Sequence, residues 1–174
     1  GPAFHGMIAA QKDKATPLLA ALTGKDRIMR RAAIRSFGSF KDKEITQAVA
    51  DKLGTLPESS QVQVIGILAG RQDPTALPAI TALSTSKNDE VRQAALDGMA
   101  QLGDTATVKP LVAAMSNEAD RPTIRQSLPR LKGDGVDKAL IAALASDSPA
   151  IRIEIIAVLH AREAASAVDT LLKI

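Results

Sequence analysis

Apolar residues recur along the chain at steps of three and four positions, which is the spacing of an amphipathic helix. A β-strand would instead alternate apolar and polar residues with a period of two. The helical spacing is clearest in two stretches, with apolar residues at Val108, Leu111, Val112 and Met115 and at Val136, Leu140, Ala143 and Leu144. The pattern therefore predicts an all-α protein.

The helical stretches also repeat along the chain. Five of them open in a similar way, on an apolar residue that is followed in four cases by arginine: Met29, Val62, Val91, Ile124 and Ile151. These positions are 33, 29, 33 and 27 residues apart, and a second amphipathic stretch follows each of them. Two helices in every thirty or so residues predict a right-handed α-solenoid of about five to six helix pairs.

Turn residues mark where several of these helices should begin. Asp73-Pro74 and Ser148-Pro149 each place a capping oxygen in front of a proline at the first helical position. Pro129 lies inside the first helical stretch of the fourth copy, where we expect it to kink the helix. The many alanines suit positions at which three helices meet, because small side chains allow close packing.

The third copy carries a resemblance to the HEAT repeat family, through Val91-Arg92, Ala94-Ala95, Gly103-Asp104 and Val108-x-Pro110-Leu111. Within that family it is similar to the phycobilisome-lyase-type HEAT-like repeats of bacterial multidomain proteins. The resemblance extends from about residue 8 to residue 174. It implies an armadillo-like superhelix that serves as a protein-binding scaffold. An exported or periplasmic location is implied by the resemblance alone, because the residues themselves leave the compartment open.

The repeats predict the domain organisation as well. Residues 1–6 read as a remnant of protease cleavage, because Gly1-Pro2 is typical of one. Residues 7–174 are expected to form a single HEAT-like repeat domain that is part of a larger protein. We expect this domain to be monomeric.

Composition argues against enzymes and nucleic-acid readers. Aromatic residues make up 2% of the chain, whereas pockets and base-stacking platforms usually need them. The 22 basic and 19 acidic residues form a mixed surface rather than a strongly basic one. Cysteine is absent, and neither a metal-ligand motif nor a phosphate-binding or nucleophile motif occurs. We therefore expect no catalytic residue, no cofactor, no metal and no membrane insertion.

One set of arginines repeats with the helices and is expected to be structural: Arg30, Arg92, Arg125 and Arg152. Each would bond a turn aspartate or a helix-end carbonyl, and in the families that the chain resembles this position is structural. Gln63 takes the place of arginine in the second copy. A ladder of cations for a polyanion is the alternative interpretation.

A second set of cations is the candidate binding site: Arg27, Arg31, Arg35 and Lys43. The three arginines are four residues apart and so share one face of a helix. We expect a non-catalytic scaffold that binds another protein or another domain of its parent chain. The alternative is an anion-binding solenoid that contacts nucleic acid through this arginine-rich face, although nucleic acid is not the expected partner.

Overall fold

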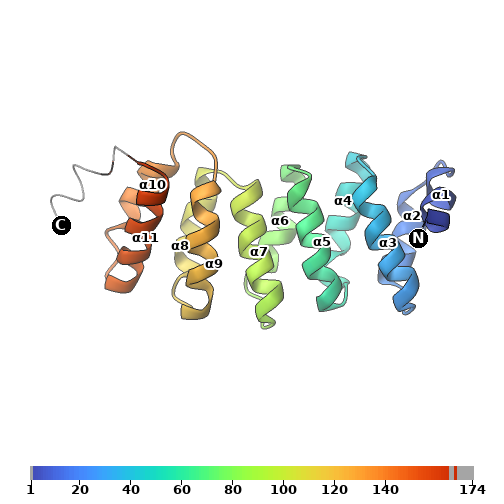
Figure 1. Ribbon diagram of the computed structural model, residues 1–174, viewed down its shortest axis with the longest axis horizontal. Coiled ribbons are helices and arrows are strands. Elements are labelled where there is room, and N and C mark those ends of the chain that lie inside the picture. Colours follow the sequence, from blue (N-terminus) through green and yellow to red (C-terminus); the bar gives the residue numbers. More distant parts are fainter. Residues whose placement is uncertain (1, 165–166, 168–174) are drawn as a thin grey trace. The chain divides into compact units, whose positions relative to one another are not determined.

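The computed structural model describes residues 2–164 and 167. Over these residues it contains eleven α-helices and no strand, which confirms the predicted all-α solenoid class (Figure 1). The helices are α1 (Pro2–Ala9), α2 (Ala15–Thr23), α3 (Arg27–Ser39), α4 (Lys43–Lys52), α5 (Glu58–Gly70), α6 (Leu77–Ala82), α7 (Asp89–Leu102), α8 (Val108–Ala114), α9 (Arg121–Ser127), α10 (Val136–Ala143) and α11 (Pro149–Ala161).

Short 3₁₀ turns join or extend several helices: η1 (Leu53–Thr55), η2 (Pro74–Ala76), η3 (Thr105–Thr107), η4 (Glu118–Asp120) and η5 (Leu128–Arg130). Asp73 accepts a hydrogen bond from the backbone of Thr75, and Ser148 accepts one from the backbone of Ile151, so both predicted helix starts are confirmed. Pro129 does not kink a helix, because α9 ends at Ser127 and the proline lies in η5.

The chain divides into two compact units, Gly1–Gly98 and Met99–Ile174, and the division falls inside α7. In the first unit the helices form two layers (Figure 1). The first helices of successive pairs pack together, with α3 against α1 and α5, and the second helices do likewise, with α4 against α2 and α6. This arrangement is the stacking of helix pairs that the periodicity predicts.

In the second unit α9 packs against α11, α8 packs against α10, and α10 also contacts α11. Its core includes Leu111, Leu128 and Leu140, none of which is exposed to solvent. Among the described residues, no helix is long and apolar enough to cross a membrane.

Helix α1 contains residues 2–6, which the sequence analysis placed before the repeat domain. Phe4 and Ile8 of this helix are buried, and the His5 ring stacks on the Phe40 ring with their centroids 4.9 Å apart. Helix α1 packs on α3. Phe4 and Ile8 are therefore part of the first unit's core, and Gly1 lies outside the described residues.

Gly98 shows why small residues are needed between the helices. A β-carbon at this position of α7 would lie 3.1 Å from a methyl group of Ile80 and 3.2 Å from one of Ile65. Ala95, one turn earlier in α7, is also fully buried. Larger side chains at these positions would push α7 away from the helices beneath it.

Candidate functional site

Four arginines share one structural role at the start of the first helices. Each donates a hydrogen bond to the backbone carbonyl six residues before it, in the turn that precedes the helix: Arg30 to Gly24 (2.6 Å), Arg92 to Ser86 (2.9 Å), Arg121 to Met115 (2.8 Å) and Arg152 to Ser146 (2.9 Å). A carbonyl at a helix end has no partner within its own helix, so a bond of this kind stabilises the turn.

The second repeat has glutamine at this position. The Gln61 side-chain amide donates to the Gly54 carbonyl at 3.3 Å, and Gln61 is buried. The repeat positions are therefore 30, 61, 92, 121 and 152, at intervals of 31, 31, 29 and 31 residues. The repeat position predicted from the sequence was Gln63 in the second copy and Arg125 in the fourth, and both predictions were wrong.

Arg125 has a different environment from the arginines with which it was grouped. It lies one turn further along α9, and its guanidinium forms an ion pair with Glu154 of α11 at 3.5 Å. The equivalent positions of the first three repeats carry Ile34, Ile65 and Leu96, all buried, and that of the fifth carries Ile156, which is 37% exposed. In the fourth repeat, an arginine that forms an ion pair thus stands where the other repeats have an apolar residue.

Three of the predicted binding residues, Arg27, Arg31 and Arg35, lie exposed on helix α3. Ile28 and Met29 of the same helix are exposed as well, Ile28 to 79%. The surface made by Arg27, Ile28, Arg31 and Arg35 is called the α3 face below. Because 3.6 residues make one turn, these four side chains project within about 100° of each other around the helix.

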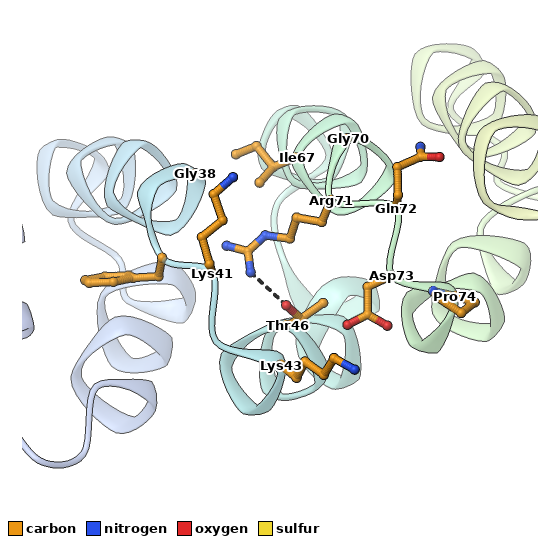
Figure 2. A pocket seen from close by; sticks show the side chains of 11 residues that line it. Gly38, Lys41, Lys43, Thr46, Ile67, Gly70, Arg71, Gln72, Asp73 and Pro74 are labelled. Carbon is orange, nitrogen blue, oxygen red and sulfur yellow. Dashed lines mark hydrogen bonds between the residues drawn. The ribbon is translucent and has the colours of Figure 1, made fainter.

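The fourth predicted binding residue, Lys43, lies elsewhere. It is the first residue of α4 and lines a pocket in the first unit, to which none of the α3 face residues contributes. The pocket has a volume of about 490 Å³ and lies between the α3–α4 connection and the end of α5 (Figure 2). Its lining consists of Gly38, Phe40, Lys41, Lys43, Thr46, Ile67, Gly70, Arg71, Gln72, Asp73 and Pro74.

Arg71 is the central cation of this pocket. Its Nη1 donates to Thr46 Oγ1 at 2.7 Å (Figure 2). Its Nη2 donates to the Phe37 carbonyl, and its guanidinium lies over the Phe37 ring. Its Nε is buried and has no hydrogen-bond partner among the described residues. Burial lowers the pKa of Arg71, whereas the negative charges of Asp42 and Asp73 act to raise it. The guanidinium stays protonated, because an arginine pKa is far above neutrality.

Two lysines add further positive charge beside Arg71. Lys41 and Lys43 line the pocket on the side of α3 and α4 (Figure 2). Among the described residues, neither lysine lies within 4 Å of a carboxylate. Asp42, which lies between them in the sequence, pairs instead with Lys14 at 3.6 Å. The pocket is therefore strongly basic.

Asp73 is the pocket's one carboxylate, and it is engaged in capping η2. Its Oδ1 accepts from the Thr75 hydroxyl at 2.7 Å and from the Thr75 backbone at 3.1 Å. These bonds, the side-chain bond first, lower the pKa of Asp73, and Lys43 and Arg71 lower it further. Asp73 is therefore ionised at neutral pH, and its charge only partly offsets the three cations.

Replacing Thr75 by valine should raise the pKa of Asp73 toward its ordinary value, because the side-chain hydrogen bond is the largest cause of the lowering. Carboxyl ¹³C NMR titration would measure it. Asp13 is the internal control, since bonds from Thr16 lower its pKa and should be unaffected. Because the folded-state pKa is lowered, the associated stability is present above the unfolded pKa and is lost as pH falls through the folded pKa. An unchanged Asp73 pKa in the variant would show that Thr75 is not the cause.

Lys43 was predicted from the sequence as a binding residue, but the pocket around it was not. Arg71 donates hydrogen bonds to Thr46 and Phe37, which lie 25 and 34 positions earlier in the chain. Such contacts follow from helix stacking rather than from a local motif. Among the described residues, no group of three or more histidine, aspartate and glutamate side chains could hold a metal ion.

Comparison with protein-family models gives a match to HEAT repeats over residues 50–128, which run from the last turn of α4 to the first residue of η5. Comparison with curated proteins gives no match. The matched segment contains the repeat positions 61, 92 and 121.

Proposed function

We propose that this chain, which carries HEAT repeats over residues 50–128, is a non-catalytic interaction module that binds another protein, or another domain where the repeats belong to a longer chain. The match to HEAT repeats carries this proposal, because such repeats commonly mediate protein interactions. Stacked helix pairs present extended surfaces to a partner while their shared core stays intact. Val91-Arg92 and Gly103-Asp104 further favour phycobilisome-lyase-type repeats.

The α3 face supports a protein as the partner rather than a nucleic acid. It combines three arginines with the exposed Ile28, and Met29 lies beside it. Arginine, methionine and apolar side chains are typical of the centre of protein–protein interfaces. A protein surface that binds nucleic acid would be expected to combine lysine and arginine with aromatic side chains that stack on the bases.

A photocrosslinking amino acid at Ile28 should capture a defined partner in cells of the source organism. The same amino acid at Lys109, an exposed position of α8 in the second unit, is the control and should not capture that protein. The purified partner should then bind the unmodified chain with a Kd of about 10 µM or lower. The variant Ile28→Asp/Arg31→Glu should weaken binding at least about tenfold, as loss of a central interface residue does.

Strong nucleic-acid binding by the same proteins would contradict the proposal. We expect mixed-sequence DNA or RNA to bind no tighter than about 10⁻⁴ M at physiological salt, the weak end of non-specific affinity. Micromolar affinity that falls steeply with salt and disappears in Arg31→Glu/Arg35→Glu would instead establish an anion-binding solenoid. Equal crosslinking from positions 28 and 109 would also contradict the proposal.

A further inference from the structure

The chain contains a second arginine in the same structural position as Arg71. Arg71 and Arg162 are 91 positions apart, and each follows directly after a first helix, α5 or α11. In both places the next residue has a left-handed backbone, Gln72 with φ 55° and Glu163 with φ 53°. Both side chains reach back to the preceding helix pair of their own unit. The two sites can therefore be compared residue by residue.

In the second unit this arginine meets a carboxylate of the chain itself. Arg162 Nε donates to Asp137 Oδ1 at 2.5 Å, and Nη1 donates to the carbonyls of Pro129 and Leu131 at 2.9 and 2.8 Å. The corresponding position in the first unit, 91 residues earlier, is Thr46. A neutral hydroxyl therefore stands where the second unit has a carboxylate, and within the described part of the chain the Nε of Arg71 has no hydrogen-bond partner.

The first unit also has more positive charge around this arginine. Lys41 has a counterpart in Lys132, but Lys43 corresponds to Asp134. The first unit thus has a lysine and a threonine in place of two aspartates of the second, Asp134 and Asp137. It also has Gln72 in place of Glu163, whereas Asp42 and Asp73 stand where the second unit has Gly133 and Ala164. The result is an open basic pocket at the position where the second unit is internally neutralised.

We propose that the pocket formed by Lys41, Lys43 and Arg71 binds a carboxylate from an acidic segment of a partner protein, in the role that Asp137 has beside Arg162. This inference rests on the proposed function, because it names the chemistry of the bound partner. The chain's own precedent for a ligand of this guanidinium is a carboxylate. The volume of about 490 Å³ lies within the range of small-ligand pockets and accommodates an acidic side chain.

Binding of an eight-residue oligo-glutamate peptide, followed by NMR at low salt, tests the pocket directly. Saturable chemical-shift changes are expected at Gly38, Lys41, Gly70 and Gln72, with a Kd for the peptide below about 1 mM. Thr46→Asp supplies the missing carboxylate internally and should weaken binding at least about tenfold. Thr46→Asn introduces a side chain of the same shape as aspartate but without the charge, so this variant should still bind the peptide. Lys41→Gln/Lys43→Gln should also weaken binding at least about tenfold, so the test stands if Thr46→Asp does not fold.

A matched control separates the pocket from net charge. Arg27→Gln/Arg31→Gln removes the same two charges from the exposed α3 face and should change the affinity less than about twofold. An equal loss in this control, or a loss in Thr46→Asn as large as in Thr46→Asp, would overturn the proposal. Inorganic phosphate that binds the same residues more tightly than oligo-glutamate would overturn the assignment to a carboxylate. The purified peptide tests the pocket alone, whereas crosslinking from Ile28 tests the proposed function, so the two can fail separately.

Discussion

Replacing Leu111 by alanine should lower the free energy of unfolding by about 2–5 kcal/mol, which is the usual cost of truncating a buried leucine. Leu111 has no solvent exposure, and its helix α8 packs against α9 and α10 within the second unit. The loss combines the transfer free energy of the removed methyl groups with the cost of the cavity that remains. Urea denaturation followed by circular dichroism measures the change.

The neighbouring Lys109 provides the control for Leu111. It lies two residues earlier in α8 and is exposed, so Lys109→Ala should change stability by less than about 0.5 kcal/mol. A cost of that small size for Leu111→Ala would mean that α8 does not bury this face. If the free energy of unfolding of the Leu111→Ala variant depends less steeply on urea concentration, the cooperativity of unfolding has changed.

The helical elements could be predicted from the sequence because local signals specify them. The three- and four-residue spacing in 108–115 and 136–144 gave α8 and α10, and the Asp73-Pro74 and Ser148-Pro149 pairs marked true helix starts. Each of these signals acts within one or two turns of helix. Such features need no knowledge of which helices pack together.

The repeat register was wrong in two copies, because a polar residue occupies a position that is otherwise apolar. Ser60 and Asp120 are both buried and precede the repeat positions 61 and 121. The next apolar residues, Val62 and Ile124, therefore appeared to open these two copies, and Arg125 was grouped with the structural arginines. Met29, Val91 and Ile151 are apolar, and their copies were aligned correctly.

The basic pocket could not be predicted from any local motif. Its cations come from the α3–α4 connection and from the end of α5, which approach one another only when successive helix pairs stack. A signal does exist at longer range, since Arg71 and Thr46 match Arg162 and Asp137 at a distance of 91 residues. Finding it requires the correct register, and the misaligned second and fourth copies concealed it.

Replacing Arg162 by alanine should cost about 2–3 kcal/mol of stability. The change removes the partner of Asp137 and of two backbone carbonyls, and groups left without partners in a folded protein are costly. Breaking a fully buried ion pair costs about 3–5 kcal/mol. The expected value is lower here because 33% of the Asp137 side chain is exposed and can regain water. Thermal and urea denaturation both measure it.

Lys138→Ala is the matched control, because it removes the same charge from the same unit. Lys138 lies next to Asp137 in α10, is exposed and, among the described residues, forms no ion pair, so its loss should cost less than about 0.5 kcal/mol. The double variant Arg162→Ala/Asp137→Ala should be more stable than the sum of its single changes predicts, since it leaves no unpaired carboxylate. Strict additivity would show that Asp137 and Arg162 act independently, and the carboxylate would then be no precedent for the ligand of Arg71.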